Sequence, residues 1–180
     1  MNYWRIYISR DNTYDIYIKE KEFEKLNSFL LLGESVIDRW DPSVELYFKK
    51  GGIDDSDVFL FNEDFFIIQK DAKVMKIFDS YVKEGLEYLN FKCDVKNLII
   101  AYPIINIDCI DMERSKYKVY KGDKDRIQRF DKLYLNKENI GEAHLFRMKH
   151  LEGGFMFCSD ILKNELEKEK VRGLEFTLID

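Results

Sequence analysis

Short apolar segments that alternate with polar residues recur along the chain, and they limit the folds that it can adopt. Trp4, Ile6 and Ile8 follow the two-residue period of a half-buried strand. Alternation or a short apolar run predicts strands at 4–8, 16–18, 44–48, 58–61, 65–68, 98–102, 105–109, 117–120, 127–135, 144–148, 155–157 and 174–178. Helical spacing predicts only two or three helices, over 22–31, 71–89 and 160–170. Because strands and helices do not alternate strictly, we expect an α+β fold of mostly antiparallel sheet.

Turn and cap residues predict how some of these elements begin and end. Asp11 and Asn12 provide a turn, so segments 4–8 and 16–18 are expected to pair as a hairpin. Asp71 is a suitable N-cap for the 71–89 helix. Gly85 lies on the apolar stripe of that helix, which a close approach to a neighbouring strand would explain.

The last predicted helix has a signal at each end. Ser159 is expected to cap its first turn, and Gly173 is expected to stop the chain from continuing as a helix. The chain has 180 residues, the size of one domain. We expect residues 1–180 to form a single domain, in which residues 1–59 provide N-terminal strands or a small appendage to residues 60–180.

Charge and cysteine content exclude several classes of protein. The net charge of −5 argues against general nucleic-acid binding, which needs a basic face. The sequence also predicts neither a secretory leader nor a membrane-spanning segment. Three widely spaced cysteines, Cys93, Cys109 and Cys158, are expected to be free thiols in a reducing cytoplasm.

The search for catalytic chemistry leaves one alternative open. His144 and His150 lack the companion residues of a zinc site, and buried thiols beside His144 would be inert. Asp108, Asp111 and Glu113 form the most suggestive acidic set, since a metal-dependent hydrolase or nuclease holds magnesium with such groups. However, residues three apart on a straight strand project from opposite faces. We therefore expect no catalytic residues, no metal and no cofactor, and we keep the hydrolase as the alternative.

Four segments of the second half resemble the Imm11-type immunity proteins of bacterial polymorphic toxin systems. Residues 102–115 resemble the family's tyrosine, its paired aspartates and its late serine. Residues 145–147 resemble a short strand of the family, residues 157–163 its serine-capped helix, and residues 171–176 its C-terminal glycine and phenylalanine. We expect the residues at the matched positions to have structural roles. These residues are Asp108, Asp111, Ser115, Phe146, Ser159, Gly173 and Phe176. The resemblance covers residues 60–180.

The resemblance implies a cytoplasmic protein that binds the C-terminal domain of a cognate toxin and neutralises it without chemistry of its own. Neither a nucleic acid nor a membrane is expected as a partner. An interaction module that shares the fold but is unrelated to immunity stays open as a further alternative.

Two sets of residues are candidates for contact with the toxin. Arg147 is expected either to clamp an internal carboxylate such as Asp108 or Asp111, or to contact the toxin. The acidic residues Asp54, Asp55, Asp57, Glu63 and Asp64 are expected to provide part of the toxin-facing surface. Their charge would complement the basic cleft of a toxin that attacks nucleic acid.

Overall fold

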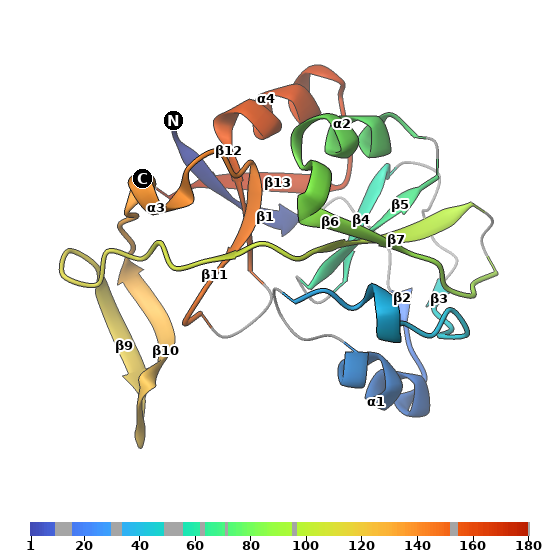
Figure 1. The fold of residues 1–180 in the computed structure, drawn as a ribbon, viewed down its shortest axis with the longest axis horizontal. Coiled ribbons are helices and arrows are strands. Elements are labelled where there is room, and N and C mark those ends of the chain that lie inside the picture. Colours follow the sequence, from blue (N-terminus) through green and yellow to red (C-terminus); the bar gives the residue numbers. More distant parts are fainter. Residues whose placement is uncertain are drawn as a thin grey trace.

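Two sheets form the body of the protein (Figure 1). The computed structural model describes residues 1–9, 16–29, 34–48, 56–61, 64–70, 72–94, 97–151 and 155–179. One sheet has the order β13 (Leu174–Leu178), β1 (Tyr3–Ile8), β12 (Met156–Ser159), β11 (Leu145–Met148) and β8 (Asn106–Ile107). The other has the order β4 (Val58–Phe61), β5 (Phe65–Gln69), β7 (Leu98–Pro103) and β6 (Leu86–Leu89). All of these neighbours are antiparallel except β11 and β8, which are parallel.

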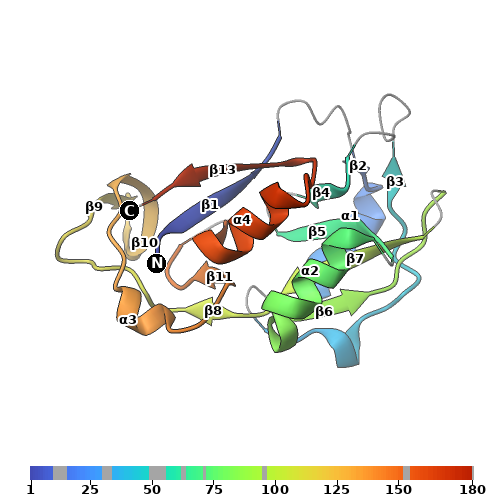
Figure 2. The ribbon, with the colours of Figure 1, turned by 90° about the horizontal axis from the view of Figure 1, so that it is seen from above.

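Helices cover both sides of the four-stranded sheet. Helices α2 (Lys73–Tyr81) and α4 (Asp160–Lys168) lie side by side (Figures 1 and 2), while α1 (Glu20–Phe29) lies on the side of the sheet away from α2. The smaller elements are α3 (Lys137–Ile140), the 3₁₀ turns η1 (Ile37–Arg39) and η3 (Lys83–Gly85), and two short ribbons, β2 (Ile16–Tyr17) with β3 (Tyr47–Phe48) and β9 (Lys116–Tyr120) with β10 (Asp123–Lys132). None of the described helices is long and apolar enough to cross a membrane.

The two faces of each sheet bury different apolar clusters, because successive side chains of a strand point to opposite faces. Val58 and Leu60 of β4 lie in a central cluster with residues of both sheets, α2 and α4. Phe59 and Phe61 point the other way, into a second cluster that includes Leu26 of α1. A third cluster lies on the outer face of the five-stranded sheet and includes Tyr3, Phe146 and Phe157. Phe176 is half-buried and packs against the central cluster.

The predicted α+β class is confirmed, and most predicted strands are present, but one predicted pairing is wrong. Strand β1 does not form a hairpin with residues 16–18: it pairs with β12 and β13, whereas β2 pairs with β3. Alternation shows which side chains share a face of a strand, but it carries no information about which strand lies alongside. The turn residues Asp11 and Asn12 lie outside the described residues.

The predicted 71–89 helix is shorter than expected. It begins at Lys73 after the N-cap Ala72 and ends at Tyr81, and the apolar residues Leu86 and Leu89 belong to β6. Asp71, the expected N-cap, lies outside the described residues. Gly85 does approach a neighbour closely, because an added Cβ would lie 2.7 Å from the Cδ1 atom of Ile105. However, Gly85 belongs to η3 and not to the helix, and Ile105 lies between β7 and β8 and not in a strand.

Helix α4 begins as predicted and ends differently. Ser159 is its N-cap and accepts a hydrogen bond from the backbone N–H of Leu162 at 3.3 Å. At the other end Lys170 adopts a left-handed φ of 53°, and the N–H groups of Lys170 and Val171 donate to the carbonyls of Glu167 and Leu166. These two bonds close the helix as a Schellman motif. Gly173 is therefore not the helix stop.

Replacing Ser159 with alanine should weaken the start of α4. Its hydroxyl is fully buried and also lies 2.8 Å from Nδ1 of His144. The substitution therefore leaves the buried N–H of Leu162 and the half-buried ring of His144 without this partner. We expect the S159A variant to lose about 1–2 kcal/mol of unfolding free energy, measured by urea denaturation. Ser80→Ala, at an exposed hydroxyl on α2, is the control and should change stability by less than about 0.5 kcal/mol.

Candidate functional site

The acidic residues of the hydrolase alternative are not gathered around one point. Asp111 accepts a hydrogen bond from the N–H of Arg114 at 3.0 Å, as the capping residue of a helical turn does. Ser115, next to this turn, receives a 2.9 Å hydrogen bond from the N–H of Tyr134. Asp108 is exposed and lies 3.5 Å from Nε2 of His150, and Glu113 is exposed as well.

The geometry around Asp108 and Asp111 is therefore that of a surface turn tied to the chain after β10. Within the described residues, no three His, Cys, Asp or Glu side chains are grouped as a metal site would need. The hydrolase alternative gains no support from this arrangement.

Two of the thiols, Cys109 and Cys158, and one histidine, His144, lie in structural positions. Burial raises the pKa of the Cys109 thiol to about 12, and it raises the pKa of Cys158 as well. A thiol with such a pKa stays protonated at neutral pH and is a poor nucleophile. His144 interacts with Ser159, the helix cap, and its ring meets that of Tyr81 edge to face at 5.9 Å between centroids.

Arg147 connects the two sheets from within the protein. Its side chain is 3% exposed and extends from β11. The guanidinium donates to the carbonyl oxygens of Asp64, just before β5, and of Pro103, at the end of β7. Its charge lies 5.7 Å from the ring centre of Tyr102, and burial lowers its pKa. The internal interaction expected for Arg147 is present, but these two acceptors are backbone carbonyls and not Asp108 or Asp111.

The acidic residues predicted to face a toxin are only partly within the described chain. Asp54, Asp55 and Glu63 lie outside it. Asp57 accepts a 2.9 Å hydrogen bond from the N–H of Arg172 and lies 3.4 Å from Nζ of Lys73, so its carboxylate holds β4 against the segment after α4. Asp64 is half-buried, with its carbonyl bound by Arg147.

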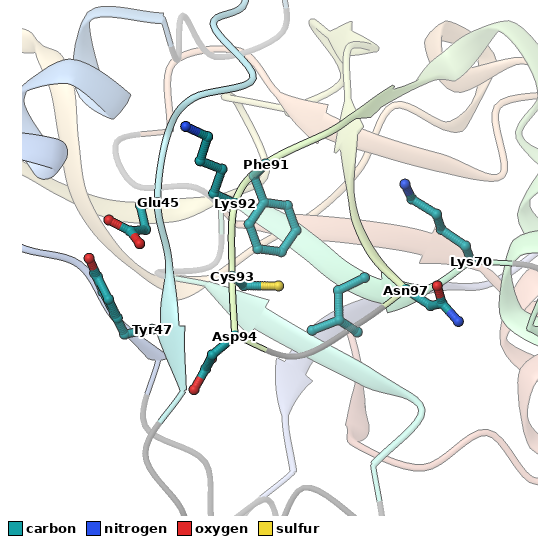
Figure 3. Close-up of a pocket in the computed structure, with 9 residues that line it drawn as sticks. Glu45, Tyr47, Lys70, Phe91, Lys92, Cys93, Asp94 and Asn97 are labelled. Carbon is teal, nitrogen blue, oxygen red and sulfur yellow. The ribbon is translucent and has the colours of Figure 1, made fainter.

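A shallow pocket of about 600 Å³ lies at the end of the four-stranded sheet (Figure 3). It is lined by Glu45, Tyr47, Lys70, Phe91, Lys92, Cys93, Asp94, Asn97 and Leu98. Segment 44–46 is attached here to Lys92 by two backbone hydrogen bonds of 2.8 and 2.9 Å. Two lysines and two acids share the rim, namely Lys70, Lys92, Glu45 and Asp94. This balanced set has no preference for a ligand of either charge.

A second concavity, the β10 groove, has a lining rich in apolar, aromatic and arginine side chains, which suits a protein partner better than the mixed charges of the first pocket do. It has a volume of about 540 Å³ and lies between the outer face of the five-stranded sheet and residues 128–133. The guanidinium of Arg5 lies 3.5 Å from the ring centre of Phe155 and 4.4 Å from that of Tyr7. Leu151, Phe157 and Ile179 add apolar lining. Stacked arginine and aromatic side chains are the residue types that dominate binding energy at protein interfaces.

The sequence alone does not identify the β10 groove. Its lining residues come from separate segments of the chain. The pairing of β1 with β12 and β13 brings three of them together, and a bridge between Ile127 and Leu151 adds β10. The one signal in the sequence is the dense run of lysines and arginines at 116–132, a stretch whose pattern by itself predicts only strands.

Comparison with known proteins covers the second part of the chain, which contains the turn at Asp111 and all of the lining of the groove except Arg5 and Tyr7. No curated protein sequence matches the chain. A family match begins within β7 and extends through β11, β12 and α4 to β13, a shorter stretch than the 60–180 expected from the motifs. The resemblance inferred from the motifs is thus confirmed over this part: residues 100–180 match the Immunity protein family (Imm11).

Proposed function

We propose that this chain is an immunity protein, which binds the toxic domain of a cognate bacterial toxin and neutralises it by forming a stoichiometric complex. The observation that carries the proposal is the match of residues 100–180 to the Imm11 immunity family. In this proposal the protein acts in the cytoplasm of the producing cell and makes or breaks no bond. It needs only a surface that fits the toxin.

The contacts of the family-like half support a binding role. Asp111 and Ser115 fix a turn, Ser159 caps a helix, and Phe146 stacks on Phe157 at 6.0 Å between ring centres. Groups held in this way form a rigid scaffold, and a preorganised surface loses less entropy on binding than a flexible one. The β10 groove opens on this scaffold and offers aromatic and cationic groups to a partner.

The acidic set is proposed as a further part of the contact surface. Asp54, Asp55 and Glu63 carry the charge that would attract a basic toxin cleft. Asp57 is better suited to a structural role, because its carboxylate already holds Arg172 and Lys73. Reversing the charge of Asp57 would therefore lower stability as well as binding, and the two effects could not be separated. The substitutions are for this reason made at Asp54 and Asp55.

The toxin domain encoded beside the gene for this chain should bind it at a one-to-one ratio. Isothermal titration of the two purified proteins measures this ratio, and co-expression tests whether the chain restores growth. We expect Asp54→Lys with Asp55→Lys to slow association by roughly tenfold at low salt, as loss of electrostatic steering does. The control is Glu138→Lys with Glu142→Lys, two exposed acids near α3 that undergo the same change of charge.

Wild-type protein that neither binds the domain nor restores growth would refute the immunity role. If both pairs of substitutions slowed association equally, the association rate would depend on the net charge of the protein and not on the acidic set.

A further inference from the structure

The β9–β10 ribbon, residues 116–132, is a basic arm on an acidic protein. It contains seven lysines and arginines and three aspartates, a net charge of +4, in a chain with a net charge of −5. The arm extends away from the two sheets at one end of the molecule (Figure 1). Charge of one sign is thus concentrated on a projecting element, where a partner can reach it.

The pairing register of the arm places like charges against each other. Lys118 lies opposite Arg129, and Lys116 lies opposite Lys132, with a shift of register before each of these pairs. Asp131, between the two cations of β10, lies 3.3 Å from Nε of Arg129. Like charges directly opposite on paired strands are destabilising, and a two-stranded ribbon is marginally stable even without them. Opposite charges at these positions would make a more stable arm. Asp131 offsets part of the repulsion at Arg129, but the arm as a whole retains a net positive charge that the pairing of its strands does not favour.

The arm also exposes aromatic surface and borders the β10 groove. Tyr117 and Tyr120 are 37% and 38% exposed, and tyrosine is enriched where proteins bind each other. Residues 128–133 form one wall of the groove, whose floor contains Arg5 stacked on Phe155. A partner that approaches the arm thus meets cations and exposed tyrosines first and an apolar, arginine-containing hollow beside them.

We propose that the arm and the β10 groove together form the docking surface for an acidic region of the partner protein. Carboxylates of the partner lie between the paired cations and relieve their repulsion, while an apolar side chain enters the groove. The proposal rests on the proposed function, since it takes the partner to be the toxin domain. A protein is favoured over a nucleic acid because the chain as a whole is acidic, which opposes a polyanion at long range.

The test is a pair of substitutions that should stabilise the arm but weaken the binding of the partner to the docking surface. Lys116→Glu and Lys118→Glu convert both repulsive pairs into attractive ones, because Lys132 and Arg129 remain opposite. We expect the melting temperature of this variant to stay the same or rise. Its association with the toxin domain, measured by stopped flow, should slow by at least about tenfold and become less sensitive to salt.

The matched control is Lys21→Glu with Lys76→Glu, which changes the net charge equally at exposed positions on α1 and α2. Its association rate should stay within about twofold of wild type. If the arm had only a structural role, the substitutions would change the melting temperature and the association rate in the same direction. The docking role instead predicts an unchanged or higher melting temperature together with slower association.

Three results would overturn the docking proposal while leaving the immunity role intact. They are unchanged association of the arm variant, equal slowing by the control, and loss of folding in the arm variant. A fluorescent single- or double-stranded oligonucleotide that binds the wild type and not the arm variant, with toxin binding unchanged, would assign the arm to nucleic acid instead. If wild-type protein does not bind the toxin domain at all, the immunity role fails first.

Discussion

Gly173→Ala is expected to lower the free energy of unfolding by about 3–5 kcal/mol, a large part of the stability of a typical domain. Gly173 has a φ of +107°, and an added Cβ would lie 2.1 Å from the carbonyl oxygen of Val58. That oxygen belongs to the backbone of β4, so it cannot rotate away. Urea denaturation followed by circular dichroism measures the loss.

Gly173 lies where the two sheets meet, so its replacement should destabilise both of them. Its carbonyl accepts a 3.0 Å hydrogen bond from Ser9, just after β1, and the carbonyl of Arg172 accepts bonds from Asp57 and Val58 at the start of β4. This crossing joins the five-stranded sheet to the four-stranded sheet. A shift of the backbone here must disturb both sheets.

Gly122→Ala is the matched control for Gly173→Ala. Gly122 has a similar φ of +102°, but no atom of the described residues lies within 4 Å of the position that an added Cβ would occupy. It should therefore show only the conformational strain, about 1–3 kcal/mol at most. Equal losses for the two variants would mean that the contact with Val58 contributes nothing.

Arg147→Met is the second substitution with a large expected effect, a loss of about 2–4 kcal/mol. Methionine fills similar space but leaves the carbonyls of Asp64 and Pro103 without the donor that they have in the wild type. Arg147→Lys should recover only part of the loss, since an ammonium lacks the planar fork that reaches two acceptors. Thermal and urea denaturation measure both variants.

The control for Arg147→Met is Arg114→Met. The side chain of Arg114 is 62% exposed and lies 3.8 Å from Asp111, so its replacement should cost less than about 0.5 kcal/mol. If Arg147→Met kept full stability but lost affinity for the toxin domain, the alternative of direct toxin contact by Arg147 would be restored.

The faces of the strands were predictable from the sequence, but their neighbours were not. Val58 and Leu60 separate from Phe59 and Phe61 as the two-residue period requires. The partners of β1 lie 150 or more residues away, and local alternation holds no information about such distant contacts. The helix predicted over 71–89 is too long, because Leu86 and Leu89 also fit a helical spacing although they lie in β6.

In the candidate site, too, features that depend on neighbouring residues could be predicted, and features that depend on distant contacts could not. Ser159 could be identified as a cap because its role depends on residues next to it in the chain. Arg147 was expected to meet a carboxylate, yet the acceptors described for it are backbone carbonyls, which every residue has and no motif marks. The basic run of the arm is visible in the sequence, but its meaning depends on the register that places Lys118 opposite Arg129.

The central position of β1 in its sheet has a consequence for synthesis. Both neighbours of β1, β12 and β13, follow almost the entire remaining chain, so the first strand leaves the ribosome long before either exists. Closing so long a loop is slow, and until then the backbone N–H and C=O groups of β1 have no neighbouring strand to pair with. A nascent chain interrupted before residue 156 would therefore have no five-stranded sheet.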